Sequence, residues 1–415
     1  MNLYKLWYNI PMAKNDNSAS VKSGLRLLRL GWFCHNFMLI LPVIVLIYTQ
    51  KGITVGDFFL IQGLFRVAAF LFEIPSGYMS DCLSRRLVLI SAAAVATAGF
   101  ATVAMAHGFW MIMLGEGLMG VASALFSGTL EAYTYDLLKR NNTQQEFLRE
   151  FGEVETFGNI ASFVATILGG MLFAKIGGDN LLWIETAIAS IAIVAFLFLP
   201  ELTEVKRVVN HKSALQDAIG ITVNTMKNPK LRNFIIFPSL FGAFTIVLLW
   251  ILQPVMKDAT VPVSLFGFYV GANQLERAIL SKYAYKICDK LGNMTTSVLS
   301  VLSVVLCIVA GILALHVNNM IMVYILCAIV AMVPPLQALV KLQYNTLIHH
   351  HIKSTERGTV ISTRAMVGTI LGALLLVIVK FLVDYTGLTI TLICSLVGTI
   401  SLFWALHKVS GFIKR

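Results

Sequence analysis

Residues 77–86 read GYMSDCLSRR, a short polar stretch between two long apolar segments. A related stretch, CDKLGN at residues 288–293, lies between the second and third apolar segments of the second half, as the first stretch does in the first half. Asp81 and Asp289 are 208 positions apart, about half the length of the 415-residue chain. This spacing indicates one ancestral half used twice, and it predicts a duplicated helical membrane protein.

The composition favours the same class. The chain is 57% apolar and 13% charged, whereas soluble domains are roughly 45–50% apolar and about 25% charged. Lipid can accommodate this excess of apolar residues, and a soluble core cannot. Segments that cross a bilayer must satisfy their own backbone hydrogen bonds, so we expect helices rather than open strands.

Twelve apolar segments are long enough to cross a bilayer, which takes about 20 residues each. They are residues 29–49, 57–79, 87–106, 109–136, 152–175, 181–199, 233–255, 264–287, 295–315, 319–345, 357–382 and 388–407. The sequence therefore predicts an all-α membrane protein with twelve transmembrane helices in two pseudo-symmetric six-helix bundles. The expected organisation is a cytoplasmic N-terminal segment (1–28), a first bundle (29–199), a cytoplasmic linker (200–232), a second bundle (233–407) and a cytoplasmic tail (408–415).

The net charge of +11 comes from Lys and Arg gathered beside one set of loops. With the N-terminus inside, most basic residues fall in or next to cytoplasmic segments, which is the positive-inside bias of membrane proteins. The charge therefore predicts an orientation, with both termini in the cytoplasm, and no nucleic-acid partner. The partners expected are the lipid bilayer, a small-molecule substrate and protons, and the chain is expected to be a monomer.

Five residues of the first polar stretch and its flank resemble the loop motif of the major facilitator superfamily, G-x-x-x-D-x-x-G-R-[KR]-x-x-L. They are Gly77, Asp81, Arg85, Arg86 and Leu89. The resemblance extends over the chain through the number of spans, the linker at the midpoint and the degenerate repeat at Asp289. Ser84 stands where the family has a second glycine. The resemblance implies the major facilitator fold and a multi-pass protein of the bacterial cytoplasmic (inner) membrane.

In that family the loop cluster holds the two halves together in the outward-open state. The resemblance therefore implies a gate formed by Gly77, Asp81, Arg85, Arg86, Asp136 and Asp289, with Asp136 at the end of the fourth span as the acidic partner of the arginines. The alternative is that the arginines only fix the topology.

Two further family patterns are kept only in part. The fourth span of drug–proton antiporters usually carries R-x-x-Q-G-x-G, and here Glu116 stands in place of the arginine. The fifth span commonly ends G-P-x-x-G-G, and here only Gly169 and Gly170 remain of its glycines. The antiporter subtype is therefore not implied, and export stays open.

Ionisable residues inside spans are costly and mark pathways or paired sites. In the first half these candidates are His35, Arg66, Glu73, Glu116 and Glu131. Arg66 and Glu116 lie at similar depth, so the sequence allows them to pair. Glu116, Gly120, Ser123, Ser127 and Glu131 form a stripe at helical spacing. The stripe either lines a wet cavity or packs helices through small residues.

Further pathway candidates lie in the second half, namely Asn273, Gln274, Glu276, Arg277, Gln337, Lys341 and Arg364. They either contact an anionic group of a substrate or anchor helices and close the cytoplasmic side. The pairs Gly267/Gly271 and Gly368/Gly372 have close-packing spacing, and we expect them where the halves meet.

These features predict a secondary transporter that moves a small organic solute by rocking of its two halves around a central site. Proton coupling is expected, with Glu73, Glu116 and Glu131 as candidate carriers, because a carboxyl group removed from water can exchange protons near neutral pH. Efflux is favoured over the alternative of metabolite uptake by a symporter or uniporter. A non-transporting sensor or enzyme on the same scaffold is a further alternative. No cofactor, metal-binding or enzyme motif is recognisable, and the tract His349–His351 is interpreted as a solvated surface.

Overall fold

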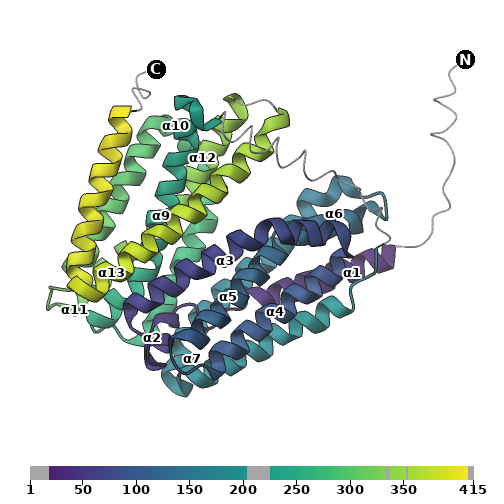
Figure 1. Cartoon of the computed structure of the whole chain (residues 1–415), viewed down its shortest axis with the longest axis horizontal. Helices are drawn as coiled ribbons and strands as arrows, with labels where there is room; N and C mark the ends of the chain where they lie inside the picture. The colour runs from purple at the N-terminus through teal and green to yellow at the C-terminus, as the bar shows by residue number, and fades with distance from the viewer. Residues whose placement is uncertain (1–17, 203–224, 333–335, 352–353, 410–415) are drawn as a thin grey trace, which may run out of the picture.

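The computed structural model describes residues 18–202, 225–332, 336–351 and 354–409. Most of the predicted linker, and parts of the predicted terminal segments, therefore lie outside the described residues. Every regular element of the described chain is helical. The helices form two groups that meet at one end and diverge toward the end from which both termini leave (Figure 1). We call the first of these the contact end.

The first group contains eight helical elements. They are α1 (Ser18–Asn36), α2 (Ile44–Gln50), α3 (Val55–Cys82), α4 (Arg85–Met105), α5 (Phe109–Phe126), α6 (Thr129–Lys139), the short 3-10 helix η2 (Gln144–Glu146) and α7 (Phe147–Leu197). The second group consists of α9 (Pro229–Asp258), α10 (Val263–Ala314), α11 (Met320–Ala331), α12 (Leu336–His351) and α13 (Ser354–Val409). Seven segments of the described chain are long and apolar enough to cross a membrane by length and composition.

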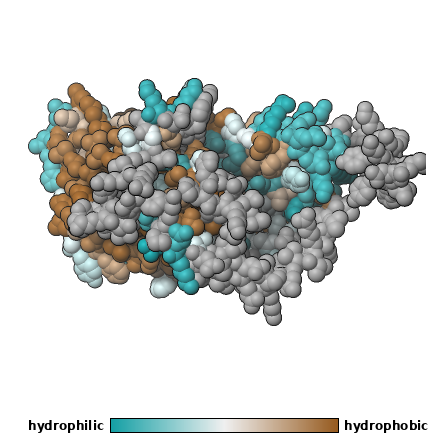
Figure 2. Space-filling model, turned by 90° about the horizontal axis from the view of Figure 1, so that it is seen from above, coloured by the Kyte–Doolittle hydropathy of each residue, from teal (hydrophilic) through white to brown (hydrophobic). Residues whose placement is uncertain are grey.

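The helices follow the predicted spans with two systematic differences. The first and fourth predicted spans are each divided into two helices, α1/α2 and α5/α6, and the described residues of the tenth lie in α11 and α12. By contrast, α7, α10 and α13 each cover two predicted spans that fold back on one another at a glycine. Large apolar side chains remain exposed on α13, among them Leu374, Ile378 and Val397. Seen from the side of the termini, apolar residues cover the flank where the second group lies (Figure 2), as expected for a surface in contact with lipid.

The start of the first helix differs from the prediction. Helix α1 begins at Ser18, inside the segment predicted as a cytoplasmic extension up to residue 28. Val21, Leu25 and Leu28 are buried at helical spacing, whereas Lys22 and Arg26 are exposed. This first part is an amphipathic helix, and its charged face lowers the average hydropathy below that of a membrane span. Helix α1 therefore begins within the predicted N-terminal segment, before the predicted first span.

Three glycines with positive φ form the turns within the helical hairpins of α7, α10 and α13. Gly177, Gly292 and Gly387 have φ values of 78°, 75° and 77° with ψ near the extended value, a region that only glycine adopts readily. Ser84, which corresponds to Gly292 in the repeat, instead has φ −66° and accepts a hydrogen bond from the Leu87 backbone N–H at 3.3 Å. Serine at the family's glycine position thus works as an N-cap of α4.

Replacing Gly177 with alanine is expected to lower the free energy of unfolding by about 1–3 kcal/mol, because a Cβ atom strains this backbone conformation. Crowding is not the cause, since no heavy atom lies within 4 Å of the position a Cβ would take. Gly398 has equally open surroundings inside α13, and there alanine should stabilise by about 0.5–1 kcal/mol. Thermal unfolding of both variants in detergent checks this, and equal shifts would contradict it.

The two groups touch through α3 with α13 and through α7 with α10. Close packing of glycine makes the second contact possible, because a Cβ on Gly170 would lie 2.9 Å from the backbone nitrogen of Gly267. The prediction that glycines mark this contact is confirmed for Gly267 and Gly271, which face α7, and for Gly372, which faces Arg66. It is wrong for Gly368, whose neighbour is Ser239 of α9 in its own group.

Candidate functional site

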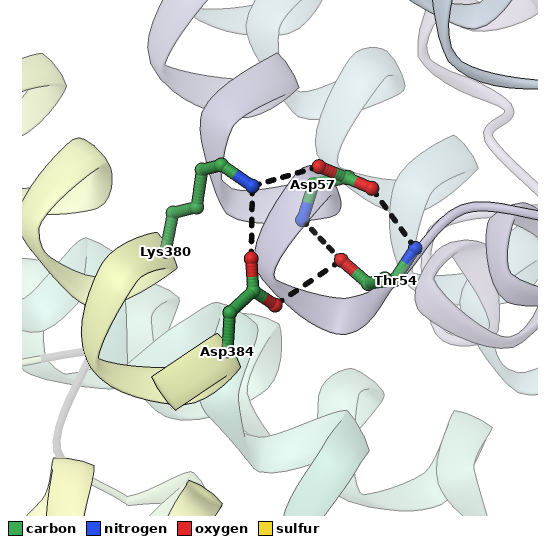
Figure 3. A network of polar contacts seen from close by, with 4 residues as sticks. All are labelled: Thr54, Asp57, Lys380 and Asp384. Atoms are coloured by element: carbon green, nitrogen blue, oxygen red, sulfur yellow. Dashed lines mark hydrogen bonds and ion pairs between the residues drawn. The ribbon is translucent and has the colours of Figure 1, made fainter. Parts of the chain in front are cut away.

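A polar network joins the two groups at the contact end (Figure 3). Lys380 of α13 donates to Asp57 of α3 and to Asp384 of α13, each at 2.8 Å. The Thr54 hydroxyl donates to Asp384 across the same boundary at 3.2 Å. Thr54 and Asp57 also form a reciprocal capping box at the start of α3, which fixes the carboxylate of Asp57. We call these four residues the Lys380 network.

The Lys380 network was not among the predicted site residues. Its one signal in the sequence is the capping box pattern of Thr54 and Asp57 before an apolar segment. The partners Lys380 and Asp384 follow more than 300 residues later, so the pairing itself depends on how the two groups dock.

Replacing Lys380 with alanine is expected to weaken the contact end, because it removes two partly exposed ion pairs and leaves two carboxylates facing each other. Only the pair with Asp57 crosses the boundary, because Asp384 lies on the same helix as Lys380. One such pair contributes up to about 1 kcal/mol, so the separated population should rise roughly fivefold. Spin labels at Trp110 and Tyr385, which are 74% and 82% exposed at this end of the two groups, would report the distance. Lys51, which pairs with Asp179 inside the first group, is the matched control, and Lys51→Ala should leave the distance distribution unchanged. An equal effect of both variants would argue against a latch.

The predicted pair between Arg66 and Glu116 is not formed. Glu116 is buried and accepts hydrogen bonds from the Tyr48 hydroxyl at 2.6 Å and the Gln62 side-chain amide at 3.0 Å. Arg66 instead lies against Gly372 of α13, with its guanidinium nitrogens 3.7–3.8 Å from the position a Cβ would take there. In the described part of the chain no ion pair joins the two. Tyr48 and Gln62, which the sequence reasoning missed, supply uncharged partners that make a cation unnecessary.

The predicted stripe on the fourth span divides at a break in the helix. Helix α5 ends at Phe126, Gly128 has φ 72°, and α6 begins at Thr129. Before the break Gly120 packs against the Phe65 carbonyl of α3. Ser123 in the last turn of α5, Ser127 at the break and Glu131 after it line a cavity. Helix packing therefore describes the first part of the stripe, and cavity lining describes the second.

This cavity has a volume of about 280 Å³ and lies inside the first group of helices, between α1, α5, α6 and α7. Its lining consists of Trp32, His35, Ser123, Phe126, Ser127, Gly128, Leu130, Glu131, Phe151 and Glu155. Glu73, another predicted site residue, accepts a hydrogen bond from the Ser127 hydroxyl at 3.1 Å. The structure thus brings together His35, Glu73 and Glu131 from three separate spans. Sequence reasoning missed Glu155, although an acidic residue inside an apolar span is itself a signal.

The first span is interrupted between α1 and α2, and two buried side chains bind its free backbone groups. Glu185 of α7 accepts from the Leu39 backbone N–H at 2.6 Å. Gln253 of α9 accepts from the Val45 N–H at 3.1 Å and donates to the Leu41 carbonyl at 2.9 Å. Non-helical backbone at membrane depth is tolerated only where protein satisfies it. Glu185 and Gln253 were missed as site residues because the break itself was not predicted.

The gate residues of the loop motif make contacts within the first group. Arg85 pairs with Asp136 as predicted and also donates to the Ala132 carbonyl. Arg86 does not pair with Asp136: it donates to the Leu197 carbonyl and lies 4.0 Å from Glu201. Gly77 is exposed, with no heavy atom within 4 Å of its Cβ position. The side chains of Asp81 and Asp289 lie outside the described part of the structure.

The predicted residues of the second half mostly hold their own helices together. Asn273 is buried and donates to the Ala331 carbonyl at 3.0 Å, and Arg364 is buried and donates to the Lys341 carbonyl at 3.5 Å. The Gln337 amide lies 2.8 Å from the Cβ position of Gly242. Gln274 and Glu276 are half-buried and Lys341 is exposed. The side chain of Arg277 lies outside the described part. These contacts favour the anchoring alternative over an anion site.

Two docked groups of apolar helices, joined by a polar network at one end and with a cavity inside the first group, define a helical membrane protein. The chain matches the profile of the Major Facilitator Superfamily over residues 30–376, and it belongs to that family. It is a transporter of this family and not an enzyme.

The relatives give the fold and leave the substrate open. The chain is 27% identical over 131 residues to the inner membrane transport protein YajR of Escherichia coli, covering 32% of this chain and 28% of that protein. It is 28% identical over 142 residues to the bacillibactin exporter of Bacillus subtilis, covering 33% and 35%. The alignments thus span about a third of the length of these curated relatives.

Solved structures agree over almost the whole chain. The nucleoside transporter NupG superimposes with a TM-score of 0.80 at 14% identity, covering 94% of this chain and 99% of that one. A POT family transporter in complex with 5-aminolevulinic acid superimposes with a TM-score of 0.73 at 11% identity, covering 95% and 100%. At such identities the likeness concerns the fold alone.

Proposed function

We propose that this protein is a proton-coupled secondary transporter that exports a small organic solute across the cytoplasmic membrane, with both termini in the cytoplasm. The observation that carries the proposal is the cavity of the first group. Glu131 and Glu155 line it, and in the described part of the chain neither carboxylate takes part in an ion pair. Carboxyl groups that face a cavity without a fixed cation can bind and release protons or a cationic group.

Alternating access supplies the transport step. The Lys380 network and the Gly170–Gly267 packing close the contact end, which the basic loops and termini assign to the outside. The cavity lies on helices that diverge toward the other end (Figure 1). Rocking of the two groups would break the contact end and bring the opposite ends together, where the loop motif with Arg85 and Asp136 lies.

The positions of the acidic side chains support a choice among the candidate proton carriers. Glu131 faces the cavity and Glu73 lies beside it through Ser127. Glu116 is enclosed by Tyr48 and Gln62 and is buried in helix packing. We therefore assign proton exchange to Glu131, with Glu155 and Glu73 nearby, and a structural role to Glu116.

One relative supports the proposed direction of export. The bacillibactin exporter is, by its name, an export protein, and its similarity covers about a third of each chain. Uptake of a metabolite is the alternative outcome of the test.

Proton coupling can be tested before the substrate is known. Proteoliposomes loaded with the pH dye pyranine are exposed in turn to members of a metabolite and drug library. A transported solute should change the internal pH only when the protein is present. For an exported solute, protons should move in the direction opposite to that of the solute. Glu131→Gln should abolish the pH signal, whereas Glu153→Gln, which alters an acid paired with Arg29, should retain it. Solute flux with no accompanying proton flux would overturn proton coupling, and proton movement in the same direction as the solute would overturn export.

A further inference from the structure

We propose that the cavity of the first group binds the cationic, ring-bearing part of an organic cation, so that the solute class is an aromatic or apolar amine. This inference rests on the proposed function, because it assigns a substrate class to the same cavity. It follows from three observations: aromatic side chains line the cavity, two carboxylates line it as well, and the neighbouring arginines form ion pairs with acids outside the lining.

Ring-bearing side chains form part of the cavity wall. The rings of Trp32, His35 and Phe126 pack in a triangle, with centroid distances of 5.3 Å from His35 to Trp32, 4.2 Å from His35 to Phe126 and 5.7 Å from Trp32 to Phe126. Phe151 lines the cavity from α7. The faces of such rings carry negative charge density, so they attract cations and also cover apolar parts of a ligand.

Two carboxylates complete the cavity and set its charge. Glu131 comes from the first turn of α6, directly after the turn at Gly128, and Glu155 comes from α7. At Gly128 the chain leaves the axis of α5, so Glu131 does not continue the helical register of that helix. Two carboxylates beside aromatic faces favour a positively charged ligand and disfavour an anion.

The neighbouring cations do not neutralise these carboxylates. Arg29 of α1 pairs with Glu150 and Glu153 on α7, and Arg85 pairs with Asp136 on α6. Each of these acids lies on the same helix as one of the cavity carboxylates, yet none lines the cavity. Within the described residues the lining contains no Lys or Arg, so the cavity keeps its negative charge for a ligand.

The volume limits the part of the ligand that is enclosed. About 280 Å³ is at the lower end of the range of small-molecule sites, roughly 300–1,000 Å³. The cavity therefore accommodates one substituted ring or a compact ammonium group, and any remaining part of a larger solute lies outside it.

The experiment measures binding to the full-length protein in detergent, without membrane or gradient. The probes are 1-methylnicotinamide, a cation, and nicotinamide, its uncharged counterpart with the same ring. Both quench tryptophan, and Trp32 lies in the cavity wall. We expect saturable quenching by the cation at a concentration at least tenfold below that needed for nicotinamide. Trp32→Phe should remove the saturable component, which assigns the signal to this cavity.

Charge variants decide the role of the carboxylates. Glu131→Gln with Glu155→Gln should raise the half-saturating concentration of the cation at least tenfold, to that of nicotinamide. Glu155→Gln alone should give a smaller rise, and it keeps the test informative if the double variant is unstable. Glu153→Gln is the matched control and should not change binding.

Equal half-saturation for the charged and uncharged probes, or unchanged binding in both Glu155→Gln and the double variant, would overturn the proposal. The binding experiment involves no proton flux, so it tests the cation site separately from proton coupling. A negative binding result would overturn the cation site and leave proton-coupled transport standing, and a negative proton-flux result would leave the cation site standing.

Discussion

Gly267→Leu is expected to separate the two groups of helices at the contact end and to reduce transport to background. A Cβ on Gly267 would collide with the backbone carbonyl of Thr166 and lie 2.9 Å from that of Ile167. Backbone of a packed helix cannot rotate away as a side chain can, so the helices themselves must move apart. Overpacking of this kind typically costs about 1–3 kcal/mol, enough to change the balance between closed and open contact ends by roughly 5- to 150-fold.

The label pair at Trp110 and Tyr385 measures this effect directly. The distance distribution should move to longer values in Gly267→Leu and stay unchanged in Gly398→Leu, because Gly398 has no heavy atom within 4 Å of its Cβ position. The Gly267 variant should still fold, since each group also has a buried cluster of its own, one around Leu28, Leu89 and Tyr133 and one around Phe234, Ile235 and Ile348. An unchanged distribution in Gly267→Leu would show that the glycine contact does not hold the halves together.

Glu185→Leu is expected to give the second large effect, a loss of about 2–3 kcal/mol of stability. It leaves the buried Leu39 N–H without the acceptor that it now reaches at 2.6 Å, and an unsatisfied buried polar group costs about 1–3 kcal/mol. Leucine is also a poor steric substitute, because its branched side chain does not reproduce the extended shape of glutamate beside the interrupted first span. Thermal unfolding in detergent should show a clear downward shift.

Glu185→Gln is the matched control because its amide oxygen can still accept from Leu39. It should retain most of the stability, and Gln253→Leu should resemble Glu185→Leu because it frees the Val45 N–H and the Leu41 carbonyl at the other end of the interruption. Equal stability of the Leu and Gln variants at position 185 would mean that the carboxylate does not hold the interruption.

Much of the candidate site was visible in the sequence as residue types in unusual places. His35, Glu73 and Glu131 were singled out as polar residues inside apolar spans, and all three lie in or beside the cavity. The Arg85–Asp136 pair was predicted from the loop motif and is formed. The Arg66–Glu116 pair was not formed, because similar depth along two helices says nothing about the direction in which each side chain points.

The sequence by itself determined the class, the helices and the repeat. Apolar length and low charge depend only on composition, and the family resemblance at Gly77–Arg86 depends only on local residues. Tertiary structure decided which distant groups meet. The Lys380 network, the caps of Glu185 and Gln253 on the first span, and the aromatic cavity all join residues that are far apart in the chain. Buried polar groups need hydrogen-bond partners. Which distant residue becomes the partner depends on how the helices dock, so these contacts cannot be predicted from local sequence.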